Sequence, residues 1–155
     1  MNDPVFTLLD AATVATGLMA GVYFIYAVAI MPGLRRLGDS VFVAAFQATD
    51  RAIISPIFLV AFFAPTVLCG VAAFTERGEP GYRWIVASLV LNAGIVLITM
   101  TINVPLNDAL KARGDVTGAE ATAARQAFSE RRWVAWNWFR TVANLGALVC
   151  LTLVG

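Results

Sequence analysis

The residue that stands out chemically is an arginine inside the last apolar segment of the chain. The polar and aromatic side chains around it recur at i, i+4, i+7 and i+11, namely Trp133, Asn137, Arg140 and Asn144. In a helix this spacing puts all four on one face. An arginine inside hydrocarbon costs about 2.5 to 3.5 kcal/mol even on the lenient insertion scale, so it normally faces protein or water. We therefore expect an inward polar stripe on the last helix.

A second polar stripe lies on the preceding apolar segment. Its members, at i, i+4, i+11, i+15 and i+19, are Ser88, Asn92, Thr99, Asn103 and Asn107. Buried amides need partners. With a rise of about 1.5 Å per residue, Asn92 and Asn144 fall at a similar depth near the middle of their helices, where they can pair. Asn92 is thus most simply interpreted as packing glue between two helices.

Composition identifies the class of protein that must position these groups. The chain has 155 residues, of which 59% are hydrophobic and 14% charged, and a mean hydropathy of +0.77. Soluble domains carry about a quarter charged residues, so this is an integral membrane protein. The net charge of +1 gives no reason to expect nucleic acid as a partner.

The residue types absent from the sequence narrow the chemistry further. There is no histidine, which removes imidazole metal ligands and every nucleophile–histidine pair. We therefore expect no metal and no cofactor. The two cysteines, Cys69 and Cys150, lie in separate apolar runs and are interpreted as buried free thiols; a disulfide between them is left open.

The predicted fold class is all-α: one integral membrane four-helix bundle over residues 1–155, with spans at about 7–31, 53–75, 84–106 and 133–154. A short amphipathic helix at the membrane surface is expected between the first two spans. Gly17 and Gly21 form a GxxxG motif that favours close helix packing inside the chain; a homo-oligomer is left open. A capping box at Thr117 and Glu120 predicts a helix that continues into the fourth span without interruption.

The distribution of Lys and Arg predicts the orientation in the cell membrane. The two long loops carry eight such residues: Arg35, Arg36, Arg51, Lys111, Arg113, Arg125, Arg131 and Arg132. The opposite side carries only Arg77 and Arg83. We therefore expect a multi-pass protein with both termini on the non-cytoplasmic side and both long loops in the cytoplasm.

The two stripes meet at the cytoplasmic level of the predicted bundle. The side chains that converge there are Asn103, Asn107, Trp133, Asn137 and Arg140. The end of the first span joins them, where Tyr26 belongs either to an interfacial aromatic belt or to a pocket wall. Asp50 is either a solvated surface acid or the nearest counterion for Arg140. This cluster is either an internal polar clamp or a clamp that also binds a planar, oxygen-bearing aromatic.

Several stretches together resemble the anthrone oxygenase family of small four-span membrane proteins. They are GLMAGVYFIYAVAIMPGL (17–34), the helix at 42–56, NVPLN (103–107) and WNWFRT (136–141), in that order and over most of the chain. The family takes its name from fungal members that oxidise polyketide anthrones to anthraquinones without an established metal or flavin. The resemblance implies the four-span fold and, as a hypothesis, a cofactor-independent oxygenase whose partners are a lipophilic aromatic, dioxygen and membrane lipid.

The roles that follow from this hypothesis can be assigned by residue number. Arg140 is expected to stabilise an anthranol oxyanion, and Asp50 is a candidate base. Trp133 and Trp136 are expected to stack on the ring system. The ring oxygens would be oriented by Asn137, Asn103 and Asn107.

Two other functions compete with this one. The same polar stripe can serve a non-enzymatic membrane protein as glue for helix packing or for assembly with a partner. A small solute or proton carrier is the third alternative, but carriers usually show intramembrane carboxylates or internal repeats. Apart from Asp10 near the start of the first predicted span, the sequence has no acid inside a predicted span, and it has no evident repeat.

Overall fold

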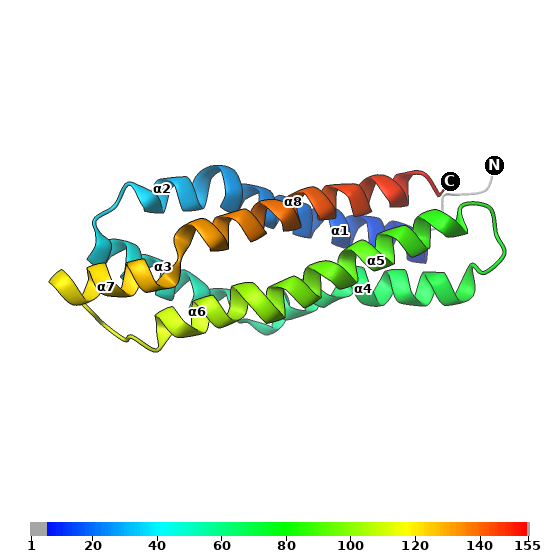
Figure 1. The fold of residues 1–155 in the computed structure, drawn as a ribbon. Helices are drawn as coiled ribbons and strands as arrows, with labels where there is room; N and C mark the ends of the chain where they lie inside the picture. The colour runs from blue at the N-terminus through cyan, green and yellow to red at the C-terminus, as the bar shows by residue number, and fades with distance from the viewer. Residues whose placement is uncertain (1–5, 155) are drawn as a thin grey trace.

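The computed structural model describes residues 6–154, and every regular element in that range is a helix. The ends of the predicted domain, residues 1–5 and 155, lie outside the described residues. Figure 1 shows an elongated molecule with both termini at one end. The elements are α1 (Leu8–Ile25), η1 (Tyr26–Ile30), α2 (Met31–Arg35), α3 (Asp39–Ile53), α4 (Pro56–Thr75), α5 (Tyr82–Ile98), η2 (Thr99–Asn103), α6 (Val104–Lys111), α7 (Gly118–Phe128) and α8 (Glu130–Thr152).

Four long helical rods run along the length of the molecule and pack side by side. α1 packs against α4 and α8, and α5 packs against the same two helices. The shorter helices α3 and α7 pack on each other at the end opposite the termini (Figure 1). Four rods can therefore enclose a common interior, which α3 and α7 cover at one end.

The outer surface is apolar, the reverse of the pattern in a soluble bundle. Three helical stretches are long and apolar enough to cross a membrane, Leu8–Arg35, Pro56–Thr75 and Tyr82–Lys111. α8 is not one of these, because its buried face carries Asn137, Arg140 and Asn144. Its outward face exposes large apolar side chains, among them Phe139 and Val142. Polar groups inside and apolar groups outside are what a lipid solvent requires.

Two π-helical turns, η1 and η2, interrupt the regular α-helix of the rods and are called the first and second wide turn below. In the first, the N–H of Met31 donates to the carbonyl of Tyr26, and in the second the N–H of Val104 donates to that of Thr99. Each wide turn lies directly before a proline, Pro32 or Pro105. A proline ring clashes with the carbonyl four residues earlier, and an extra residue in the turn moves that carbonyl away. The helices therefore continue past both prolines to Arg35 and Lys111.

The polar end of the molecule is built around the contact between α3 and α7. Phe42, Phe46 and Phe128 pack ring against ring, and Phe46 meets the edge of Trp133 at 5.7 Å. The guanidinium of Arg125 lies 4.1 Å above the Phe42 ring. The predicted helix between the first two spans is thus present as α3, with one face against α7; its place at a membrane surface stays a prediction.

The prediction of one uninterrupted helix from residue 117 into the last span is wrong. Ser129 adopts a left-handed backbone conformation with φ of 54°, which ends α7 and starts α8. The expected capping box is also not formed, because the Thr117 side chain makes no cap hydrogen bond. The break lets α7 fold over α3 instead of extending away from the molecule.

The interpretation of the cysteines as free thiols agrees with the structure. Cys69 is buried between α4 and α5, and its sulfur lies 3.5 Å from the Ser88 hydroxyl. Cys150 is half-buried on α8. The GxxxG motif is used in part, since Gly17 lies against Leu148 of α8 and no neighbouring atom lies within 4 Å of a Cβ built at Gly21.

Gly81 gives a first prediction, because it has φ of 88° and a close neighbour. A Cβ built there would lie 2.7 Å from the carbonyl oxygen of Val154. Gly81→Ala should destabilise the protein by about 1–3 kcal/mol, measured as a lower thermal unfolding midpoint in detergent. Gly94 of α5, whose built Cβ has no neighbour within 4 Å, is the matched control. Gly94→Ala should be neutral or stabilising by up to about 1 kcal/mol, and equal losses in both variants would contradict the prediction.

Asp39 gives a second prediction, on pH. A hydrogen bond from the Thr122 hydroxyl (2.7 Å) and one from Arg125 (3.0 Å) hold the pKa of Asp39 below its usual 3.8. A lowered pKa stabilises the fold above the unfolded value, and this contribution is lost as the pH falls through the folded value. Between about pH 5 and about pH 3 the thermal midpoint of the wild type should therefore fall further than that of Asp39→Asn. If the thermal midpoints of the two proteins fell by the same amount over this pH range, the ionisation of Asp39 would not contribute to the stability of the fold.

Candidate functional site

The guanidinium of Arg140 is buried where α8 faces the second wide turn. Its Nη1 donates to the Thr99 hydroxyl at 3.1 Å, and its Nη2 donates to the Asn137 side-chain oxygen at 2.9 Å. Thr99 is the first residue of the second wide turn, and Asn137 lies one turn before Arg140 on α8. The predicted inward orientation of the polar stripe is thus what the structure contains.

Aromatic rings, and no acid, surround this cation. The guanidinium carbon lies 4.9 Å from the centre of the Tyr23 ring and 5.6 Å from that of Trp133. Within residues 6–154 no carboxylate forms an ion pair with Arg140. Its buried Nε has no hydrogen-bond partner there either. Cation–π contacts replace only part of the lost hydration, so the charge of Arg140 and the donor at its Nε are incompletely compensated by these neighbours.

Asn137 holds the arginine in place with both ends of its amide. Its oxygen accepts from Arg140, while its Nδ2 donates to the Tyr23 backbone carbonyl at 3.1 Å. That carbonyl lies in the last turn of α1 before the first wide turn. Asn137 therefore ties α8 to α1 and positions Arg140, and its side-chain oxygen is already occupied.

Asp50 is neither the counterion of Arg140 nor a solvated surface acid, the two alternatives that the sequence left open, because its side chain is buried and pairs with Lys111. Its carboxylate forms an ion pair with Lys111 at 2.8 Å and accepts a hydrogen bond from Asn107 at 2.6 Å. Asn107 in turn accepts from the indole N–H of Trp133 at 2.8 Å. Lys111 is nearer than Arg140 because it sits one turn after Asn107 on the same helical stripe. The result is a chain of polar groups that links α3, α6 and α8.

Asn103 is the second buried group with an unused hydrogen-bonding atom. Its Nδ2 makes a long contact of 3.5 Å with the Trp133 carbonyl, and its side-chain oxygen has no partner among the described residues. Asn103 lies one turn after Thr99, which binds Arg140. The unpaired acceptor of Asn103 therefore lies one turn along the helix from the residue that binds Arg140, whose Nε is also unpaired.

These groups line one cavity between α1, α3, α4, the α5–α6 rod and α8. The space open to the centre of a water molecule is ≈ 140 Å³, whereas one water needs about 10–15 Å³, so a small organic molecule has room. The apolar wall includes Phe46, Phe58, Phe62, Val22 and Ile53. Within residues 6–154, no three Cys, Asp or Glu side chains come together as a metal site.

The cavity brings together all but one of the residues proposed for it from the sequence. The lining includes Tyr26, Asp50, Asn103, Asn107, Trp133, Asn137 and Arg140. The exception is Trp136, which is not part of the lining and meets the edge of Phe139 at 5.7 Å. Its predicted stacking role therefore has no support from the geometry.

Among the cavity residues that sequence reasoning did not place at the site are Thr99, Lys111 and Tyr23. Thr99 was placed on a polar stripe but not at the arginine. The signal for Lys111 was present, since Thr99, Asn103, Asn107 and Lys111 follow one another at intervals of four. Such a row occupies one helical face. Tyr23 was not separable from an interfacial aromatic residue by sequence alone.

A second polar network lies deeper in the molecule, nearer the termini. Asn144 donates to the Asn92 side-chain oxygen at 3.2 Å, which confirms the predicted pairing of these residues. Asn92 donates to the Ser88 carbonyl at 3.0 Å. None of these three residues lines the cavity. Their network joins α5 to α8 and is a packing device.

Comparison with known proteins gives one match. The sequence model of the anthrone oxygenase family, described as "Anthrone oxygenase", matches residues 42–150. This range covers most of α3 and of α8, so it includes the cavity walls other than those of α1, the first wide turn and α2, which lie before it. Neither a curated protein nor a solved structure matches the chain.

The geometry of Arg140 predicts how two substitutions should differ in stability. Arg140→Met removes a buried charge that has no acidic partner, so it should be neutral or stabilising by up to about 2 kcal/mol. Asn137→Leu removes the hydrogen bonds that Asn137 makes to Arg140 Nη2 and to the Tyr23 carbonyl, so it should cost about 1–3 kcal/mol. Thermal unfolding midpoints in detergent test both. A loss in Arg140→Met as large as in Asn137→Leu would mean that the arginine is a structural clamp.

Proposed function

The chain belongs to the anthrone oxygenase family, and on that premise we propose that it promotes the oxidation of a flat, lipophilic aromatic by dioxygen in the cavity beside Arg140. The substrate class is an anthrone or a quinol, whose acidic hydrogen can leave to give an electron-rich oxyanion. The protein's part is to bind this molecule, stabilise its anion and keep bulk water away.

One observation carries the proposal: a buried guanidinium without an acid, with a free donor, in a cavity wall. Burying such a cation costs free energy unless an anion pairs with it. A neutral ketone would gain little from it, while the enolate oxygen formed on deprotonation would gain an ion pair and a hydrogen bond. The interaction is stronger for the anion than for the substrate, which is the condition for catalysis.

The other lining residues support a flat, oxygen-bearing ligand. The side-chain oxygen of Asn103 is an unused acceptor for a phenolic hydroxyl. Tyr26 and Trp133, with ring centres 6.0 Å apart, offer aromatic surface beside it. Because Asn137 is already bonded at both ends, its role in this proposal is to position Arg140, and Asn103 takes over the contact with a ring oxygen.

The reaction balances with dioxygen as the sole oxidant. A C–H bond of the central ring breaks, its electron pair stays on the ring as the enolate, and Asp50 takes the proton. The enolate carbon then transfers its electrons to dioxygen and forms a C–O bond, and the proton returns to give a hydroperoxide. Loss of the second hydrogen as a proton breaks the O–O bond and releases water. One anthrone and one dioxygen thus yield one anthraquinone and one water.

The arrangement in the membrane is part of the proposal. α8 is the fourth span of a single domain, because it packs between α1 and α5 and turns apolar side chains outward. α3 then lies near the membrane surface at the end that carries most Lys and Arg residues, which favours the cytoplasmic side for that end. The cavity lies between α3 and the spans, at the level of the cytoplasmic leaflet.

A non-enzymatic role remains the competing candidate, and one observation favours it. Asn92, Asn144 and Asn137 all make bonds between helices, as glue for packing would. This account explains the pairing of Asn92 with Asn144, although the Asn144 side-chain oxygen has no partner among the described residues. It leaves the free donor of Arg140 and the free acceptor of Asn103 unused.

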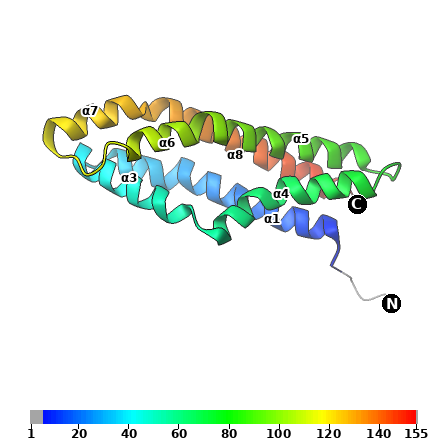
Figure 2. The ribbon, with the colours of Figure 1, turned by 90° about the horizontal axis from the view of Figure 1, so that it is seen from below.

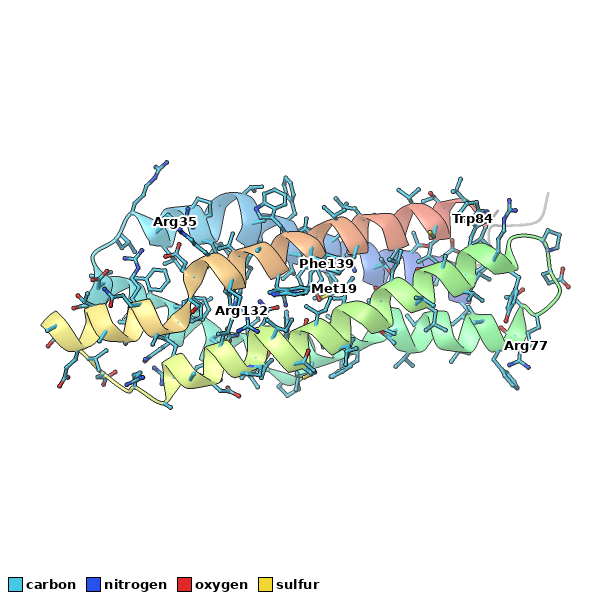
Figure 3. All side chains as sticks on the ribbon, in the orientation of Figure 1. Met19, Arg35, Arg77, Trp84, Arg132 and Phe139 are labelled. Atoms are coloured by element: carbon cyan, nitrogen blue, oxygen red, sulfur yellow. The ribbon has the colours of Figure 1, made fainter. Side chains whose placement is uncertain are left out.

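Oxygen uptake by the purified protein with an anthrone tests the proposal. Arg140→Gln removes the charge that stabilises the oxyanion and should lower turnover about 10²- to 10³-fold. Arg77→Gln is the matched control, because Arg77 is exposed at the far end of the molecule (Figure 3); it should retain wild-type turnover. Equal turnover in the wild type and Arg140→Gln would remove the arginine from the mechanism. No turnover in any of the three would favour the non-enzymatic role.

A further inference from the structure

The cavity is open at the side of the molecule, not only toward the polar end. Most of its lining is buried, but Ile54, Leu59 and Met100 line it and are also 57%, 40% and 44% exposed. Ile54 lies between α3 and α4, Leu59 on the first turns of α4, and Met100 in the second wide turn. We call the gap that these three side chains frame the lateral opening.

The backbone explains why the opening is at this place. Ile54 ends α3 with ψ of 65°, and Ser55 caps the start of α4 by accepting from the Phe58 N–H at 3.3 Å. The chain therefore turns a corner here, which Figure 2 shows between α3 and α4 below the α5–α6 rod. On the opposite side the wide turn η2 interrupts the regular helix. Two irregular segments face each other, so neither closes the side of the cavity.

The surroundings of the opening change from apolar to polar along the molecule. Toward the termini it is flanked by exposed Ile57, Val60 and Leu97. Toward α3 and α6 the exposed lining residues are Thr49 and Asp108. An apolar rim next to a polar one suits the boundary between hydrocarbon and headgroups, where a lipophilic molecule with an oxygen function concentrates.

We propose that ligands reach the cavity sideways from the hydrocarbon through the lateral opening, and that Met100 controls which ring systems pass. The proposal rests on the proposed function for the class of ligand, a flat lipophilic aromatic. It adds the route and a residue that determines specificity. An unbranched thioether with three rotatable bonds can move aside for a flat ring, and a rigid indole at the same position cannot.

The test uses the full chain in lipid vesicles and a hydroxyanthraquinone, a product-like ligand that dioxygen cannot oxidise further. Its own visible fluorescence reports binding, so added tryptophans do not interfere. Met100→Trp should slow association and dissociation on the order of tenfold each, with little change in Kd. The matched control is Val90→Trp, on α5 about 15 Å nearer the termini, 63% exposed and outside the cavity lining; its rates should stay within about twofold of the wild type.

Each outcome decides something. Wild-type rates in Met100→Trp, or equal slowing in Met100→Trp and Val90→Trp, would overturn the lateral route. Ile54→Trp, on the other side of the opening, repeats the test if Met100→Trp does not fold. Failure of the wild type to bind the hydroxyanthraquinone would overturn both the ligand class and the route. Binding with slowed rates but without oxygen uptake from an anthrone would support the route and reject the oxygenase reaction.

Discussion

The packing of the helices in this molecule depends on where the charged side chain of Arg140 is buried. Arg140 is removed from water without an acid beside it, and two oxygen acceptors and two aromatic faces hold it. In hydrocarbon this charge would be costly, so the neighbouring rods must present polar atoms at its level. Thr99 and Asn137 do so, and Asn137 is itself fixed by the backbone of α1. The packing of α1 against α8 and the position of the Arg140 guanidinium therefore depend on each other, since both rest on Asn137.

The two wide turns make this geometry available. A regular helix has every carbonyl engaged and its side chains in fixed rows, whereas an added residue shifts the rows that follow it. The turn at Thr99–Asn103 begins with Thr99, which binds the arginine, and contains Met100 at the side of the cavity. The turn at Tyr26–Ile30 begins with Tyr26 in the cavity wall. A proline follows each wide turn, and in a regular helix its ring would collide with the carbonyl four residues earlier. The wide turn removes that clash, so the helix continues past the proline.

Sequence alone predicts much of this site where periodicity governs, and fails where it does not. The spacing of Asn137, Arg140 and Asn144 predicted one inward face, and depth counting predicted the pairing with Asn92. Trp136 lies about 60° from Trp133 at 100° per residue, at the edge of that face, and simple grouping by proximity in sequence placed it wrongly. The partner of Asp50 depends on how α3 returns to α6, which no local pattern encodes. Ser129 is not a residue type that signals a left-handed break, so the end of α7 could not be predicted.

The break at Ser129 separates two parts of the chain that a continuous helix would have coupled. In one unbroken helix, each residue inserted upstream would rotate everything downstream by about 100° relative to α3. The guanidinium would then leave its interior position after a change in length far from the cavity. Because a single left-handed residue joins α7 to α8, α7 can change in length and sequence without rotating α8. The register of α8 is then determined by its contacts with α1 and α5. The molecule can thus remodel the end of its cavity independently of the charge at the cavity wall.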